Sequence, residues 1–312
     1  MLALLLAGAL AAGGYAGGTT LCTLQDPRIT ESSGLVASST SDDVLYTHND
    51  SGDVARFFAI DRHCRTLATF LLSGVQARDW EDISRGPGHT LWLGDIGDNS
   101  AIRDRGILVH RVTEPGPAEG VVRVASTAYR LHYPDGPHDA EALLVHPRTG
   151  QLLIVTKAFV GGRVYAAPLP LRADAPNLLR KVGDVPVPEV TGGDISPDGT
   201  HLVLRNYTAA YEWDVARDDV IGALRAAPVR VPLPASPQGE GITYTRDGQG
   251  LIVSSEGLSS PLQELRHVRE PARSARRQEP RRADHTRRNT VIVAIALLVA
   301  GLAGLGITRH RR

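Results

Sequence analysis

Five short segments of the sequence resemble one another and decide the fold: SSGLVAS (32–38), WEDISRG (80–86), AEALLVH (140–146), GGDISPD (192–198) and GEGITYT (239–245). Each predicts a short strand that is followed by a turn and then by a second, more apolar strand. Their equivalent positions Ser33, Glu81, Glu141, Gly193 and Glu240 are separated by 48, 60, 52 and 47 residues. A repeat of this length with almost no helical periodicity is typical of the blades of a β-propeller.

The number of strands per repeat supports the same architecture. A third strand follows in every repeat and a fourth in all but the last, for which the N-terminal TLCTLQD (20–26) supplies the missing strand and closes the ring. We therefore predict an all-β fold, a β-propeller with five visible four-stranded repeats. Six blades are an alternative, because the interval between Glu81 and Glu141 is the longest and could contain a further blade. A β-sandwich would explain the alternation of apolar residues but not the repeated register of acidic ones.

The charge of the chain is unevenly distributed. Twelve of the 34 basic residues but only three of the 34 acidic ones lie from residue 266 onward, which leaves 22 basic and 31 acidic residues in 1–265. An acidic body argues against nucleic acid as a partner, because the phosphate backbone is bound by basic surfaces. It favours cations.

Both ends of the chain carry apolar runs. Residues 2–12 have the length of a signal peptide, although they lack the positively charged start of one, and cleavage is expected in the stretch Ala11 to Gly18. Residues 290–308 contain no charge and are long enough to cross a bilayer. The alternative for this run is a buried core helix, which we disfavour because few residues follow that could cover it.

These features divide the chain into five parts. We predict a signal peptide at 1–19, the propeller at 20–266, an Arg- and Pro-rich linker at 267–288, a transmembrane helix at 289–308 and a cytoplasmic tail at 309–312. The expected location is the cell membrane, single-pass, with the propeller extracytoplasmic. The arginines of the linker keep it extended or hold anionic lipid head groups. Cys22 and Cys64 are the only cysteines, and in an exported chain they are either bridged or free.

Acidic residues recur where the first strand of each repeat begins. In a propeller these strands line the central channel, and the antiparallel second strands return to the same face. This places two sets of residues around one mouth: the starts of the first strands contribute Glu31, Asp79, Glu81, Asp82, Asp139, Glu141, Asp194 and Glu240, and the ends of the second strands contribute His48, Asn49, Asp50, Asp95, Asp98, Asn99, Lys157, Arg205, Asn206 and Glu256.

Such a concentration of carboxylates has two explanations. Oxygen ligands suit a hard cation such as Ca²⁺, which takes six to eight of them. The other explanation is that the carboxylates cap strand ends or pair with Lys157 and Arg205. The acids at 79–82 and the DIGDN stretch at 95–99 exceed what capping requires, so the pattern predicts at least one metal site.

Several of these motifs, among them THNDSGD, DWEDI, LWLGDIGDN, HDAEALLV and QGEGITY, resemble the phytase-like, "esterase-like" secreted propeller proteins of bacteria, over residues 27–266. The resemblance implies calcium ions held by rim acids and basic residues that grip phosphate. Carried over residue by residue, it implies that the metal ligands are Glu81, Asp82, Asp98, Asp139, Glu141 and Glu240, and that Lys157 and Arg205 bind phosphate. From their place at the same mouth, His48 and Asn49 are predicted as further ligand-binding residues.

Two functions follow, and the sequence leaves open whether the protein is an enzyme. One is a membrane-tethered binding module whose acidic, cation-binding rim binds a small-molecule or envelope ligand. The other is a calcium-dependent, phytase-like hydrolase of phosphoesters or esters, in which the cation polarises the scissile group. Neither a Gly-x-Ser-x-Gly motif nor a P-loop occurs in the sequence, which argues against a serine hydrolase of that type and an ATP-driven reaction.

Overall fold

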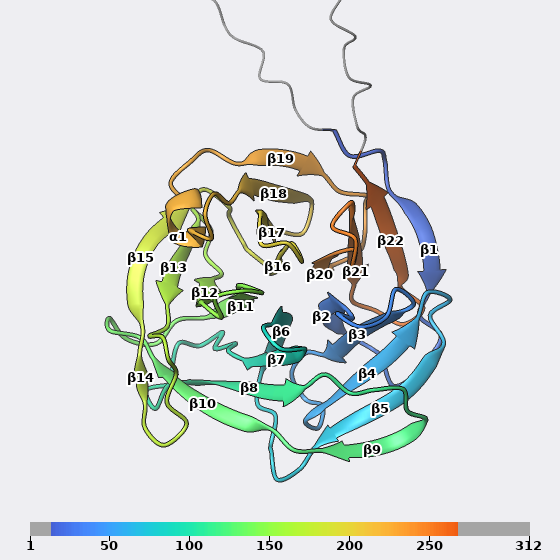
Figure 1. Ribbon diagram of the computed structural model, residues 1–312, viewed down its shortest axis with the longest axis horizontal. Helices are drawn as coiled ribbons and strands as arrows, with labels where there is room; N and C mark the ends of the chain where they lie inside the picture. The colour runs from blue at the N-terminus through green and yellow to red at the C-terminus, as the bar shows by residue number, and fades with distance from the viewer. Residues whose placement is uncertain (1–13, 268–312) are drawn as a thin grey trace, which may run out of the picture. The chain divides into compact units, whose positions relative to one another are not determined.

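The chain folds into five sheets of mainly antiparallel strands, arranged as blades around a central channel (Figure 1). The structure is a computed structural model that describes residues 14–267, all within one compact unit. The innermost strands β2 (Ser32–Ala37), β6 (Trp80–Gly86), β11 (Ala140–Val145), β16 (Gly192–Ile195) and β20 (Gly239–Tyr244) contact one another in a closed ring. They are the five segments that the sequence repeat predicts.

Blades 1 and 2 each contain five strands. Blade 1 runs outward from β2 through β3 (Val44–Asn49), β4 (Arg56–Asp61), β5 (Thr66–Leu72) and β9 (Gly120–Val124). Blade 2 runs from β6 through β7 (Thr90–Asp95), β8 (Ile107–Thr113), β10 (Thr127–His132) and β14 (Asn177–Leu178). Their outermost strands β9 and β14 pair in parallel with their neighbours.

The other three blades have four strands each. Blade 3 consists of β11, β12 (Leu152–Thr156), β13 (Gly162–Ala166) and β15 (Arg180–Val185). Blade 4 consists of β16, β17 (His201–Arg205), β18 (Ala209–Asp214) and β19 (Val229–Pro232), with the short helix α1 (Val220–Ala223) before β19. Blade 5 consists of β20, β21 (Gly250–Ser255), β22 (Pro261–Arg266) and β1 (Thr19–Thr23).

The long interval between Glu81 and Glu141 contains no sixth blade. The stretch at 122–133 is divided between two blades. Its first part belongs to β9, which lies along β5 of blade 1, and its second part forms β10 of blade 2. The chain therefore crosses from blade 2 to blade 1 and back, and the extra residues strap the two blades together.

The predicted closure of the ring is confirmed. β1 pairs antiparallel with β22, so the first strand of the chain completes the last blade. Cys22 of β1 forms a disulfide with Cys64, which follows β4 of blade 1. This bond settles the cysteine pairing that the sequence left open and joins the closing strand to blade 1. Tyr15 forms a β-bridge with His267, directly after β22 of blade 5, and its hydroxyl donates to Glu212 of β18 in blade 4 at 2.8 Å.

Apolar side chains fill the spaces between blades, because both faces of each blade are covered by its neighbours. Phe57, Phe70, Trp80 and Leu93 belong to the cluster between blades 1 and 2, for example. The inner strands are buried along their whole length and leave one edge facing the channel. Polar side chains form hydrogen bonds with backbone groups along that edge.

No helix within residues 14–267 is long and apolar enough to cross a membrane. The predicted linker, transmembrane helix and tail, and most of the predicted signal peptide, lie outside the described residues.

Candidate metal centre at the channel mouth

Seven carboxylates gather at the end of the channel where the inner strands begin, and we call this set the acidic mouth: Asp50, Asp79, Glu81, Asp139, Glu141, Glu240 and Glu256. Blades 2 and 3 contribute the same pattern, an acid just before the inner strand and a Glu two residues later, in Asp79 with Glu81 and Asp139 with Glu141. The pairing of β6 with β7 and of β11 with β12 is irregular at Glu81 and Glu141. Such a bulge redirects a side chain, and here both glutamates face the mouth.

Two groups of these carboxylates have ligand geometry. One oxygen from each of Asp50, Asp79 and Glu81 lies within 4.8 Å of the others, and the same holds for Glu81, Asp139 and Glu141. Glu81 belongs to both groups, so the two groups are adjacent and have one carboxylate in common. Buried acidic residues of the mouth could therefore hold a metal ion, and the donors are the oxygens that hard divalent cations prefer.

Two further observations fit a cation at this place. Glu240 is 3% exposed, and its Oε2 atom has no hydrogen-bond partner. Gly97, in the DIGDN loop, lies so close that a Cβ atom would stand 2.0 Å from Glu81 Oε1 and 2.6 Å from Asp79 Oδ2. The loop can cover the carboxylates only because it has no side chain at that position.

Four carboxyl groups of the mouth, those of Asp79, Glu81, Glu141 and Glu240, bind protons unusually tightly. Burial and the neighbouring Asp50 raise the pKa of Asp79 to about 6, and burial with the nearby Glu141 raises the pKa of Glu240 to about 8. Burial raises the pKa of Glu141 to about 7 even though Lys157 opposes the shift, and the pKa of Glu81 lies well above its ordinary range for reasons of burial and the Glu141 charge. Negative charge accumulates here at a cost that a bound cation would relieve.

Lys157 is the basic side chain that enters the mouth. It follows β12, and its ammonium lies 2.8 Å from Glu141 Oε1 and 5.3 Å from the centre of the Tyr207 ring. Burial lowers the pKa of Lys157, but Glu141 and Tyr207 together raise it by more, so the group stays charged.

Two of the predicted metal ligands, Asp82 and Asp98, are used elsewhere. The Asp82 carboxylate is fully buried and accepts hydrogen bonds from the backbone N–H groups of Ile83, Leu143 and Gly193. It satisfies the inner edges of blades 3 and 4 across the channel. The Asp98 carboxylate accepts from the backbone N–H groups of Ile102 and Arg103 and shapes its own loop.

Three of the four predicted ligand-binding residues also have structural contacts. Arg205 is 1% exposed and donates to the backbone carbonyls of Asn206, Gly241 and Ser254. The Asn49 side chain accepts from the N–H groups of Thr30 and Glu31. His48 is fully buried against Trp80, and burial lowers its pKa to about 4, so it is neutral. Of the predicted set, the structure brings Glu81, Asp139, Glu141, Glu240 and Lys157 together.

The sequence-based ligand set omitted Asp50 and Asp79, which belong to the ligand groups, and Glu256 and Tyr207, which stand beside them. The position of Asp79 in the sequence, two residues before Glu81, could have predicted its role. Side chains two residues apart point to the same side of an extended strand, so Asp79 accompanies Glu81 whereas the adjacent Asp82 does not. Nothing in the local sequence marks Tyr207, because its position against Lys157 depends on the packing of blade 4 beside blade 3.

A buried ion pair fixes the loop that carries Asp79. Arg103 donates to Asp95 Oδ1 at 2.8 Å and to the Gly97 carbonyl at 2.9 Å. The Asp95 carboxylate in turn accepts from the backbone N–H groups of Arg78 and Asp79, each at 3.2 Å. These bonds hold the two covering loops of blade 2 in one arrangement.

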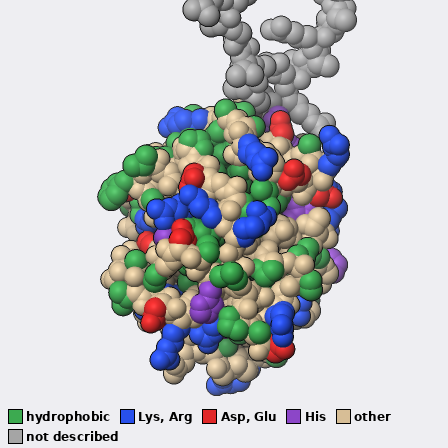
Figure 2. Space-filling model, turned by 90° about the vertical axis from the view of Figure 1, so that its left-hand side faces the viewer, with side chains coloured by type: hydrophobic (Ala, Val, Ile, Leu, Met, Phe, Trp, Pro, Cys, Tyr) green, Lys and Arg blue, Asp and Glu red, His purple; other side chains and the backbone are tan. Residues whose placement is uncertain are grey.

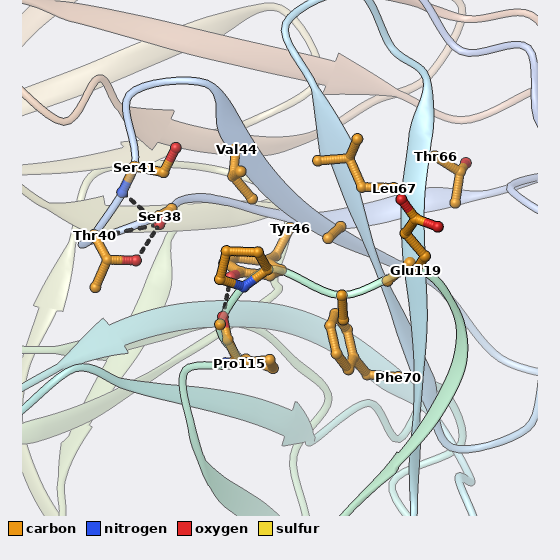
Figure 3. A pocket seen from close by; sticks show the side chains of 15 residues that line it. Ser38, Thr40, Ser41, Val44, Tyr46, Thr66, Leu67, Phe70, Pro115 and Glu119 are labelled. Atoms are coloured by element: carbon orange, nitrogen blue, oxygen red, sulfur yellow. Dashed lines mark hydrogen bonds between the residues drawn. The ribbon is translucent and has the colours of Figure 1, made fainter.

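A separate cavity of about 970 Å³ lies on blade 1 at the opposite end of β2 and β3. Figure 3 shows that Tyr46, Leu67 and Phe70 line it together with the connection that carries Pro115 and Glu119. The Tyr46 hydroxyl donates to the Pro115 carbonyl at 3.1 Å. This cavity is mainly apolar and contributes no residue to the acidic mouth.

The outer wall that Figure 2 presents carries a mixture of side chains. Basic and acidic groups stand among hydrophobic ones there, and the basic groups do not merge into one field across that face.

The fold and the site define a five-bladed β-propeller with a carboxylate-lined channel mouth. No family model matches the chain, and no curated protein matches it. Among solved structures it is similar to a gluconolactonase from Xanthomonas campestris, described as important in glucose secondary metabolic pathways, with 14% identity and a TM-score of 0.49 over 82% of this chain and 91% of that one. The five blades are established by the strand pairing of the chain itself.

Proposed function

We propose that the propeller is a calcium-dependent binding domain. Calcium is held at the acidic mouth by the two carboxylate groups, that of Asp50, Asp79 and Glu81 and that of Glu81, Asp139 and Glu141, with Glu240 beside them. A ligand with anionic oxygens completes the coordination. The observation that carries this proposal is the geometry of the two carboxylate groups, which share Glu81 and in each of which the ligand oxygens lie within 4.8 Å of one another.

Calcium is the preferred ion because of the donor set. The ligand groups contain only carboxylates, without His or Cys, and oxygen-only sites with several charged ligands are typical of Ca²⁺. The motifs that resemble phytase-like propellers support the same choice. A partner for such a domain is a small molecule or an envelope component that carries phosphate or carboxylate oxygens.

The proposal includes a membrane tether, which rests on the sequence. The uncharged run at 290–308 supports a single span. The apolar run at 2–12, which has the length of a signal peptide, supports a propeller outside the cytoplasm.

Hydrolysis of phosphoesters or esters is the second candidate, and Glu240 favours it. When bound, the ion would polarise the scissile group and lower the pKa of a water molecule. The pKa of Glu240, about 8, keeps its carboxyl protonated at neutral pH, which suits a general acid that donates to a leaving group. Lys157 would orient the anionic end of such a substrate.

Calcium titration of the purified full-length chain tests the proposal. We expect Ca²⁺ to raise the melting temperature and chelator to reverse it, because an ion that binds only the folded state stabilises it, by about 2.7 kcal/mol at a hundred times its dissociation constant. Glu141→Gln should weaken the response, whereas Asp184→Asn, at an exposed acid of blade 3, should not. An unchanged melting temperature in wild type would refute the metal site.

A substrate panel then separates the two functions. Phosphomonoesters, carboxyl esters and lactones are incubated with the chain in calcium and in chelator. Turnover that chelator abolishes identifies a hydrolase. Calcium-dependent stability without turnover identifies the binding domain.

A further inference from the structure

We propose that the Lys157 ammonium is a tethered counter-cation of the acidic mouth, which an entering divalent cation displaces from Glu141. This inference rests on the proposed function, since it concerns how the same site exchanges its charges. Lys157 would then set the affinity for the ion, in contrast to the phosphate grip that the sequence resemblance implies.

The contacts of the Lys157 backbone N–H and of its ammonium support an exchange of this ammonium for a metal ion. Its backbone N–H donates to the Asp139 carbonyl at 3.1 Å, which fixes the start of the side chain beside one ligand of the second carboxylate group. Its ammonium lies 2.8 Å from Oε1 of Glu141, another ligand of that group. The ammonium therefore neutralises an oxygen that a metal ion would need.

The other buried cations near the mouth cannot take this role. Arg103 is bound to Asp95 and the Gly97 carbonyl, and Arg205 donates to backbone carbonyls. Among the ion pairs of residues 14–267, the one with Glu141 is made by Lys157. In the metal-free protein, the positive charge of Lys157 therefore offsets part of the repulsion among the carboxylates that form the two ligand groups.

After displacement from Glu141, the ammonium can keep its contact with the Tyr207 ring and can reach solvent. It already lies over the Tyr207 ring, and an aromatic face attracts a cation without competing for carboxylate oxygens. The Lys157 side chain is 23% exposed, compared with 6% for that of Glu141. A rotation of the lysine can therefore open Glu141 while the ammonium stays near the ring and solvent.

Replacement of Lys157 by Met tests the exchange in the full-length chain. Met keeps much of the length and removes the charge, so we expect calcium to bind at least about tenfold more tightly, and the metal-free chain to melt at a lower temperature. The control is Lys181→Met, since Lys181 is the only other lysine and pairs with Asp184 in blade 3. It should leave calcium affinity unchanged. Equal or weaker calcium binding by Lys157→Met would overturn the proposal.

A double-mutant cycle distinguishes displacement from a distant charge effect. If the ammonium must leave Glu141, the gain from Lys157→Met should shrink markedly in the Glu141→Gln background, where that contact is gone. A gain of the same size in both backgrounds would show that Lys157 acts only through its field, and would overturn the displacement.

The ammonium itself can be observed, because the chain has two lysines. Reductive methylation with ¹³C-formaldehyde keeps the charge and gives one resolvable signal for each lysine. Calcium should shift the Lys157 signal and leave that of Lys181 in place, whereas two unmoved signals in a calcium-saturated chain would contradict displacement.

The outcomes also separate the two proposals. Calcium binding by wild type with no effect of Lys157→Met removes this inference and leaves the metal site. Binding by both chains, tighter in Lys157→Met, supports displacement. Binding by Lys157→Met alone would show that calcium does not displace the ammonium, and binding by neither chain removes both proposals.

Discussion

Gly97 shows at the scale of one residue how the acidic mouth is built. A Cβ atom there would lie 2.0 Å from Glu81 Oε1, so Gly97→Ala has to push away the side chain shared by both ligand groups. We expect this variant to lose most of its calcium-induced rise in melting temperature while its stability in chelator changes little, because the displaced atoms are the flexible ends of side chains. Gly183→Ala is the control, since a Cβ atom at Gly183 meets nothing within 4 Å. A full calcium response in Gly97→Ala would contradict the placement of the ion.

Glu240 gives the site a defined pH dependence. Its pKa rises from an ordinary 4.5 to about 8 in the folded chain, mainly through burial. A carboxyl group with a raised pKa binds its proton more tightly in the folded state. That contribution to stability is fully present below the pKa of the unfolded chain and is lost as the pH rises through about 8.

Glu240→Gln should therefore stabilise the metal-free chain at high pH only. Between pH of about 5 and about 8.5 we expect its advantage in melting temperature over wild type to grow by several degrees, given about 2–4 °C per kcal/mol for a domain of this size. Thermal denaturation in metal-free buffers measures it. A constant difference across this range would show that Glu240 is not titrating in the folded state.

At the scale of the element, the inner strands are joined by side chains and not by a continuous ladder. Asp82 illustrates this, because its carboxylate accepts from Leu143 N–H of β11 and Gly193 N–H of β16. Asp82→Asn turns an amide donor toward one of these backbone donors, so we expect a loss of about 1–3 kcal/mol of stability. Urea denaturation measures the loss. The calcium response should persist, and its disappearance would instead return Asp82 to the ligand set.

The closing strand β1 is held by pairing with β22 and by the Cys22–Cys64 disulfide. The two cysteines are 42 residues apart in sequence, and the removal of such a cross-link typically costs about 2–4 kcal/mol. The Cys22→Ala, Cys64→Ala chain should unfold at lower urea concentration than the oxidised wild type. Reductant should destabilise wild type toward the variant and leave the variant unchanged. If reductant leaves wild type unchanged too, the disulfide is not formed in solution.

For the whole molecule, the tether predicted at 289–308 lies outside the described residues but can be tested directly. Deletion of residues 289–312 should release the chain from the membrane fraction into the soluble fraction, because it removes the uncharged run that is proposed as the span. Fractionation of cells that express either form measures the release, and the full-length chain is the control. Retention of the shortened chain in the membrane would refute a single C-terminal anchor.

The sequence by itself determined the propeller, its repeat and its closure. Each inner strand is marked by a local pattern of apolar residues, turn and acid, and a missing fourth strand in the last repeat has one available donor at the N-terminus. These features are local or follow from counting, so they can be read without knowing how distant segments meet. The acidic character of the mouth follows in the same way from the register of Glu81, Glu141 and Glu240.

Only the tertiary structure decided which side chains form the site. Bulges direct Glu81 and Glu141 into the mouth, while the neighbouring Asp82 turns to strands of two other blades. Arg205 was predicted to bind phosphate, but it is buried and donates to backbone carbonyls of blade 5. Strand β9 lies within the second repeat of the sequence but pairs with β5 of blade 1. In each case the outcome depends on unsatisfied backbone groups or strand edges of a different blade. A local sequence pattern carries no information about those partners, because they come together only when the ring closes.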